Sequence, residues 1–249
     1  MEIDTLIAAL AAEGPALAGA AAKAGVGAHV PTCPDWSVAD LLRHLGGVHR
    51  WATTIVAERR PASPSDEEVE PWFTGPADDE LLDWFDAGHG ALVAALRAAD
   101  PAADFWAFLP APSPLAFWAR RQAHETCVHR LDVEAAAGMS SEIDPALAVD
   151  GIDELLFGFF SRKRSRLVAD PPVSLALRST DTGDGWTVRV GAEAREVVRE
   201  AGSADCSVSG PAAALYAGLW NRRPLGDLDV AGDSAVLEIW RERALVTWS

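Results

Sequence analysis

The sequence predicts an α+β protein, in which an N-terminal four-helix bundle precedes a small C-terminal α/β domain. Residues 1–168 consist mainly of long segments with apolar residues at helical spacing, joined by shorter polar or Pro-rich stretches. The composition changes at the Pro-rich stretch 169–172, and beyond it apolar and polar residues alternate as they do in strands. We therefore expect the bundle over residues 1–168 and the α/β domain over residues 169–249.

The helices of the first part begin and end at recognisable residues. Ser37, with Asp40 three residues later, resembles a capping box that has Asp in place of the usual Glu. Pro114 suits the first turn of a helix, and Gly138 follows the end of that helix. We expect helices over residues 4–24, 37–59, 78–99, 114–137 and 145–164.

Two longer loops are expected between these helices. Residues 60–77 are rich in Pro, Ser, Glu and Asp, whereas residues 100–113 are apolar and aromatic through Phe105, Trp106 and Phe108.

The C-terminal part is expected to combine short strands with two helices. Alternating apolar and polar residues predict strands over residues 173–180, 186–190 and 196–199. A turn cluster at 181–185 joins the first two strands into a hairpin. Helices are expected near residues 211–221 and 233–243, separated by residues 227–230.

The composition excludes several classes of function. A net charge of −16 argues against nucleic-acid binding, which needs a basic surface to displace counterions. No apolar run reaches the roughly 18 residues of a membrane span, and the acidic N-terminus lacks the positive region of a secretory signal. We therefore expect a cytoplasmic protein. Its three cysteines, Cys33, Cys127 and Cys206, form no C-x-x-C pair, which argues against a disulfide scaffold and a Cys-rich zinc site.

The helix predicted over residues 114–137 contains a candidate pair of metal ligands. The run His124-Glu125-Thr126-Cys127-Val128-His129 looks like the H-E-x-x-H motif of zinc proteases, but its second His comes one residue late. At about 100° per residue, His124 and His129 point about 140° apart. Glu125 and His129 are four residues apart and share one face of the helix, so both can bind a single metal ion. Asp132 lies on the same stripe and can orient His129.

A third ligand must come from another segment, and the helix predicted over residues 37–59 offers two histidines. His44 lies on the apolar, inward stripe with Leu41 and Val48, whereas His49 is rotated by about 140° toward the edge. An inward polar side chain needs a partner or a metal. The glycine pair 46–47 costs helix stability, which indicates close approach of a neighbouring helix or a ligand.

Simpler interpretations of these residues stay open at this point. A Glu and a His one helical turn apart often form a surface hydrogen bond, and an inward His is often satisfied by a backbone carbonyl. We interpret His29, His89 and His124 as ordinary surface or loop residues. The residues alone thus predict a helix bundle with a candidate metal site.

Two segments resemble signatures of a known family. The family is that of the mycothiol-dependent maleylpyruvate isomerases. Its first motif resembles residues 30–51, which begin Val-Pro-Thr-Cys-Pro-Asp-Trp and contain His44. Its second motif resembles residues 120–132, which contain Glu125 and His129. This family comprises actinobacterial relatives of the DinB-like bundle proteins. The resemblance implies a DinB-like four-helix bundle and a small second domain. It also implies that His44, Glu125 and His129 hold zinc or another divalent metal.

The resemblance also implies a reaction. It places an Arg of the second domain near the metal, for which Arg222 is our choice and Arg223 the next, although both also suit an exposed helix end. Mycothiol would be the thiol cosubstrate, and an electrophilic small molecule would undergo isomerisation or S-transfer. The aromatic loop 100–110 and the many Trp residues would line the substrate pocket. A metal-dependent hydrolase or detoxifying enzyme on the same bundle and a non-catalytic ligand-binding module are the alternatives. We expect a monomer or homodimer with no membrane or nucleic-acid partner.

Overall fold

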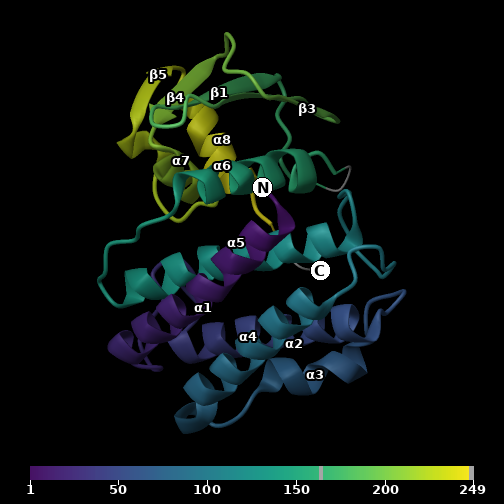
Figure 1. Cartoon of the computed structure of the whole chain (residues 1–249). Helices are drawn as coiled ribbons and strands as arrows, with labels where there is room; N and C mark the ends of the chain where they lie inside the picture. Colours follow the sequence, from purple (N-terminus) through teal and green to yellow (C-terminus); the bar gives the residue numbers. More distant parts are fainter. Residues whose placement is uncertain (163–164, 247–249) are drawn as a thin grey trace. The chain divides into compact units, whose positions relative to one another are not determined.

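The computed structural model describes residues 1–162 and 165–246, and its contacts divide the chain into two units. The first unit is Met1–Ser141 and the second is Glu142–Ser249 (Figure 1). The boundary that we predicted after residue 168 falls inside the second unit, because helix α6 (Pro145–Asp153) packs against α7 (Ala212–Leu219).

Four long helices build the first unit. They are α1 (Ile3–Ala24), α2 (Val38–Glu58), α4 (Leu81–Ala98) and α5 (Pro114–Ala136). Helices α1 and α2 each pack against both α4 and α5, which confirms the predicted four-helix bundle. A short 3₁₀ turn, Asp78–Glu80, precedes α4.

The helix that carries His44 begins at the predicted capping box. The backbone N–H of Asp40 donates to Ser37 Oγ at 3.2 Å, and the backbone N–H of Ser37 donates to Asp40 Oδ2 at 2.9 Å. The hydrogen bonds to this carboxylate lower the pKa of Asp40. Helix α5 also begins as predicted, because Ser113 caps it and Pro114 occupies its first turn.

The predicted loop 60–77 contains a further helix, α3 (Asp66–Thr74), and the prediction of a continuous loop is wrong there. Ser65 and Glu68 form a capping box at its start. No residue of α3 is buried, so the sequence carries no apolar stripe from which this helix could be recognised.

The glycine pair of α2 lets two other helices approach closely, as the sequence predicts. A Cβ atom on Gly46 would lie 2.1 Å from the ring of Trp84 of α4, and one on Gly47 would lie 2.7 Å from the ring of Phe73 of α3. The guanidinium carbon of Arg50 lies 3.7 Å from the centre of the Trp84 ring and holds that ring in place.

Helix α1 is long and apolar enough to cross a membrane by length and composition alone, with a mean hydropathy of 1.4. A core helix of a soluble protein passes the same test, and α1 packs against α4 and α5. The half-buried Glu13 also pairs with the buried Arg130, which pairs with Glu134, and this ion-pair network ties α1 to α5. These contacts are those of a bundle helix.

The second unit contains a five-stranded mixed sheet with the strand order β3-β2-β1-β4-β5. The hairpin of β1 (Val173–Ser179) and β2 (Gly185–Val190) is antiparallel, as predicted. The third predicted strand, β3 (Arg195–Val198), pairs antiparallel with β2. The sequence did not predict the last two strands. These are β4 (Cys206–Gly210), which is parallel to β1, and β5 (Asp229–Gly232), which has no buried residue.

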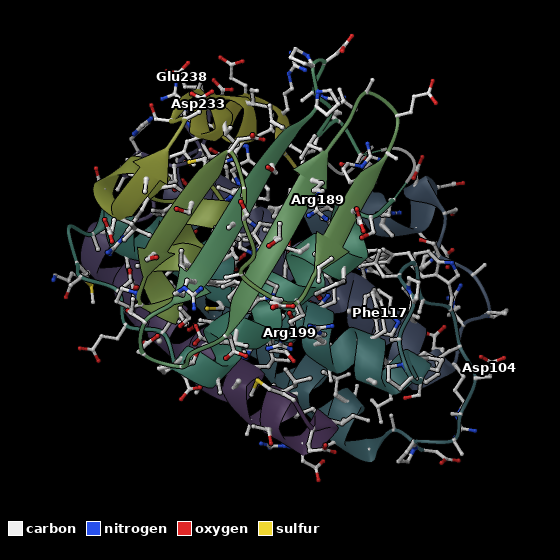
Figure 2. The ribbon with its side chains drawn as sticks, turned by 90° about the horizontal axis from the view of Figure 1, so that it is seen from above. Asp104, Phe117, Arg189, Arg199, Asp233 and Glu238 are labelled. Atoms are coloured by element: carbon white, nitrogen blue, oxygen red, sulfur yellow. The ribbon has the colours of Figure 1, made fainter. Side chains whose placement is uncertain are left out.

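Helices cover one face of this sheet. Helix α7 packs on β1 and β4, and α8 (Ala235–Arg243) packs on β1. Figure 2 looks onto the opposite face, on which Arg189 of β2 is exposed. Helix α6 continues as a π-helical segment, Glu154–Phe159, and the predicted end of this helix at residue 164 lies outside the described residues.

Candidate metal centre

Three side chains from two helices of the first unit meet at one point. His44 comes from α2, and Glu125 and His129 come from α5, one helical turn apart. One ligand atom of each lies within 4.8 Å of the other two. The structure therefore brings together all three residues that the sequence and the resemblance selected.

The distances within this cluster suit a small divalent cation. Glu125 Oε1 lies 3.6 Å from His44 Nε2 and 3.4 Å from His129 Nε2. Zinc–ligand bonds of roughly 2.0–2.1 Å at tetrahedral angles place two ligand atoms about 3.3 Å apart. Glu125 Oε1 is also buried and accepts no hydrogen bond. A buried carboxylate oxygen that two imidazole nitrogens approach only to 3.4 and 3.6 Å, outside hydrogen-bond geometry, is poorly satisfied, and a cation among the three atoms would satisfy it.

The second oxygen of Glu125 is held by a buried arginine that we did not predict from the sequence. Arg121 Nη2 donates to Glu125 Oε2 at 2.9 Å. Burial raises the pKa of Glu125, but the Arg121 guanidinium, together with His129 and His44, outweighs burial and holds the pKa well below its usual range. Glu125 is therefore ionised. Its spacing of four residues from Arg121 on α5 was the signal that could have found this pair.

Asp132 orients His129, as the spacing predicts. The Nδ1 atom of His129 lies 2.9 Å from Asp132 Oδ2, and this hydrogen bond leaves Nε2 facing Glu125. Burial lowers the pKa of His129, but the hydrogen bond to Asp132 and the proximity of Glu125 outweigh burial and raise the pKa to about 9. A metal that binds here must displace a proton from this pair.

Residues 30–36, which precede α2 and belong to the first sequence motif, contact Asp132. Thr32 Oγ1 donates to Asp132 Oδ1 at 2.5 Å, and Cys33 Sγ lies 3.8 Å from Asp132 Oδ2. Backbone hydrogen bonds between Val30 and Trp36 and between Cys33 and Trp36 close this segment into a turn. This turn therefore positions the carboxylate of Asp132, and that carboxylate orients His129.

The other histidines do not join the cluster. His49 is fully buried, and its Nε2 atom lies 3.0 Å from Thr126 Oγ1. Burial lowers the pKa of His49 well below its ordinary value, so this ring is neutral. His89 and His124 are buried, so our interpretation of them as surface or loop residues is wrong, whereas His29 is exposed as expected.

Two aromatic rings flank His44. The Trp36 ring centre lies 4.9 Å from that of His44 and 6.2 Å from that of His129, and the Phe73 ring centre lies 6.1 Å from that of His44. The side chain of His44 is 21% exposed, against 10% for His129 and 7% for Glu125. The cluster is therefore open to solvent mainly at His44, beside these rings.

Two family models match the chain in the same order as its two units. A model described as the mycothiol maleylpyruvate isomerase N-terminal domain matches residues 7–134, which include the whole cluster. The chain belongs to the mycothiol maleylpyruvate isomerase family. The model of the family's C-terminal domain matches residues 146–238.

Solved structures of similar fold carry the same family name. A crystal structure of the mycothiol-dependent maleylpyruvate isomerase is 14% identical to the chain with a TM-score of 0.64, and covers 93% of both chains. A crystal structure of a mutant of a protein with that title is 13% identical with a TM-score of 0.65, again over 93% of both chains. These likenesses confirm the predicted α+β fold. None of the curated protein sequences matches the chain.

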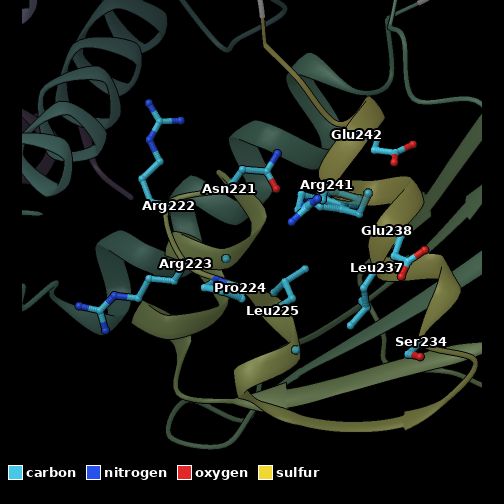
Figure 3. A pocket seen from close by; sticks show the side chains of 13 residues that line it. Asn221, Arg222, Arg223, Pro224, Leu225, Ser234, Leu237, Glu238, Arg241 and Glu242 are labelled. Atoms are coloured by element: carbon cyan, nitrogen blue, oxygen red, sulfur yellow. The ribbon is translucent and has the colours of Figure 1, made fainter. Parts of the chain in front are cut away.

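The arginine that the family resemblance implies belongs to the second unit. Arg222 is half-buried, and its Nη1 atom donates to the backbone oxygen of Trp220 at 2.8 Å. It lines a cavity of about 690 Å³ together with Arg223 and Arg241 (Figure 3). The three clustered side chains are not among the described residues that line this cavity. The role of Arg222 in the family reaction stays a prediction.

The aromatic loop 100–113 is anchored in the first unit of this family member. Trp118 Nε1 donates to the backbone oxygen of Trp106 at 2.7 Å, and Phe108 packs edge-on against Phe117 at 4.6 Å. Phe117 is labelled in Figure 2. These contacts give the loop a structural role, and a role in lining the substrate pocket stays a prediction.

Proposed function

We propose that this family member is a metal-dependent enzyme in which His44, Glu125 and His129 hold zinc or another divalent cation. Mycothiol would be its thiol cosubstrate, and its substrate would be an electrophilic small molecule. The observation that carries the proposal is the buried Glu125 Oε1, which accepts no hydrogen bond and lies 3.4 and 3.6 Å from two imidazole nitrogens. Three protein ligands leave one coordination position open, as catalysis requires.

The bound metal would supply the positive charge that makes a small thiol acidic and nucleophilic near neutral pH. The residues of the chain prepare the site for it. Arg121 keeps Glu125 ionised, and Asp132 fixes the orientation of His129. His44 forms the solvent-facing edge of the cluster.

The reaction of such a thiol depends on the electrophile. Its addition to a conjugated enone turns the double bond into a single bond, rotation follows, and loss of the same thiol gives the isomer. Attack on an epoxide breaks a C–O bond and leaves an alkoxide, and attack on a halide releases the halide ion; both give S-transfer instead. We propose Arg222 as the cation that holds a substrate carboxylate or stabilises developing negative charge. We place the enzyme in the cytoplasm, where thiols stay reduced.

Metal content tests the proposed site directly. The protein is purified without chelators, and zinc is measured for the wild type, His44→Ala and the control Glu193→Ala, which changes an exposed carboxylate of the second unit. We expect about one metal per chain in the wild type and the control and a large loss in His44→Ala. A wild-type content far below one per chain, unchanged by His44→Ala, contradicts the proposal and favours a non-catalytic module.

Thiol dependence separates the proposed reaction from metal-dependent hydrolysis. Turnover of maleylpyruvate and of a panel of epoxides and halides is measured with and without mycothiol. We expect consumption of at least one compound only when mycothiol is present. Equal turnover under both conditions excludes the thiol mechanism and favours the hydrolase.

A further inference from the structure

We propose that Trp36 and Phe73 form an aromatic mouth for the metal centre and select molecules that carry a planar, unsaturated and uncharged carbon segment beside the reacting atom. The inference rests on the proposed function and narrows its substrate class. It follows from the position of the two rings, from the exposure of Phe73 and from the charge of α3.

The two rings stand at the open edge of the cluster. His44 is the most exposed of the three clustered side chains, and both ring centres lie within 6.1 Å of its own. Trp36 comes from the turn before α2, and Phe73 comes from α3. A molecule that reaches the cluster past His44 therefore passes aromatic side chains from two separate elements.

Phe73 does not serve as a core residue. Its side chain belongs to a helix without a single buried residue, and Phe73 is 37% exposed. Its position is nevertheless fixed, because Gly47 offers the ring a surface without a Cβ atom. Arg43, the neighbour of His44, holds the segment that follows α3 by donating to Pro76 O at 3.0 Å and to Asp78 Oδ1 at 2.5 Å. An exposed phenyl ring held at a fixed place beside a metal-site histidine is suited to contact a ligand.

The chemistry of this mouth favours a planar and uncharged group. Aromatic rings prefer offset or edge-on contacts with other π-systems, at centre separations of about 4.5–7 Å. Glu70 lies three residues before Phe73 on α3 and is exposed, so an anionic group beside the Phe73 ring would be repelled. The other three carboxylates of α3, Asp66, Glu67 and Glu68, lie in its first turn, and Glu68 is paired with Arg60 at 3.0 Å.

Two matched thiols test this inference on the full-length protein loaded with Co²⁺, whose visible spectrum reports on the coordinated atoms. Benzyl mercaptan and cyclohexylmethanethiol share the same CH₂SH head and have rings of the same size, but only the first ring is planar. We expect benzyl mercaptan to bind with a Kd about two- to tenfold lower, the range that one or two aromatic contacts supply.

Variants locate the effect. Phe73→Leu keeps an apolar side chain but loses the planar ring, so the two dissociation constants should become nearly equal, whereas Phe73→Tyr should keep the preference. Gly47→Ala should act like Phe73→Leu, because its Cβ atom displaces the ring. The control Phe157→Ala removes another exposed phenyl ring, 43% exposed, and should change nothing.

The outcomes separate the aromatic mouth from the metal centre. If the wild type binds cobalt but shows equal dissociation constants for both thiols, the aromatic mouth is refuted while the metal centre stands. The aromatic mouth is also refuted if Phe73→Leu retains the full preference with an unchanged cobalt spectrum and thermal unfolding. If the wild type gives no cobalt spectrum at all, the proposed function itself fails.

Discussion

Replacement of Asp132 by Asn tests how much the metal affinity depends on the carboxylate that accepts the hydrogen bond of His129 Nδ1. Asp132 is fully buried, and its carboxylate accepts hydrogen bonds from His129 Nδ1 at 2.9 Å and from Thr32 Oγ1 at 2.5 Å. Asn keeps the size and one acceptor for the Nδ1 hydrogen but removes the negative charge that makes His129 a stronger ligand. Substitutions behind a metal ligand cost about 10- to 100-fold in metal affinity, or about 1.4–2.7 kcal/mol. We expect a loss in this range for Asp132→Asn.

Zinc affinity is measured by competition with a chromophoric chelator at constant pH. Thr32→Val serves as the matched control, since it removes one hydrogen bond to Asp132 but leaves the carboxylate in place. Its effect should be clearly smaller than that of Asp132→Asn. An affinity of Asp132→Asn within twofold of the wild type, with an unchanged circular dichroism spectrum, refutes the claim that Asp132 supports the metal ligand.

Three further predictions concern the bundle and the second unit. The fold lowers the pKa of His49, so its ring stays neutral, whereas the unfolded chain takes up a proton there below about pH 6.5. Urea titrations should therefore show the free energy of unfolding falling by up to about 1.4 kcal/mol per pH unit as the pH drops below this value, and His49→Gln should lose this pH dependence. Gly46→Ala should lower the free energy of unfolding by about 1–3 kcal/mol, because its Cβ atom would lie 2.1 Å from the ring of Trp84. The control Gly19→Ala has open space around it and should be neutral or stabilising, so equal effects of the two variants would contradict the packing of Trp84 on Gly46. Arg222→Ala should lower mycothiol-dependent kcat/KM about 100- to 1,000-fold, and Arg223→Ala only a few-fold, so that the reverse order would move the proposed cation to Arg223.

The elements that the sequence predicted well are those with strong local signals. The capping box of Ser37 and Asp40 placed the start of α2 to within a residue, and Pro114 placed the start of α5. Helix α3 buries no residue and strand β5 buries none either, so neither carries the apolar periodicity on which such predictions depend. Their positions depend on tertiary contacts.

The residues of the candidate site also differ in how far the sequence predicted them. The face shared by Glu125 and His129 follows from helical geometry, whereas the choice of His44 over His49 needed the family resemblance. Arg121 was not predicted although its spacing from Glu125 is visible in the sequence, because a buried Arg is rare and is not itself a metal ligand. The contact of Phe73 with the site joins segments far apart in the sequence, and no local pattern reports such a contact.

The most direct test of the metal centre is a crystal structure of chelator-free protein with anomalous diffraction data collected on both sides of the zinc edge. We predict one anomalous peak per chain, about 2.0–2.2 Å from His44 Nε2, His129 Nε2 and a carboxylate oxygen of Glu125. A peak at other residues, or no peak at these three side chains in crystals grown with zinc, would contradict the proposed metal centre.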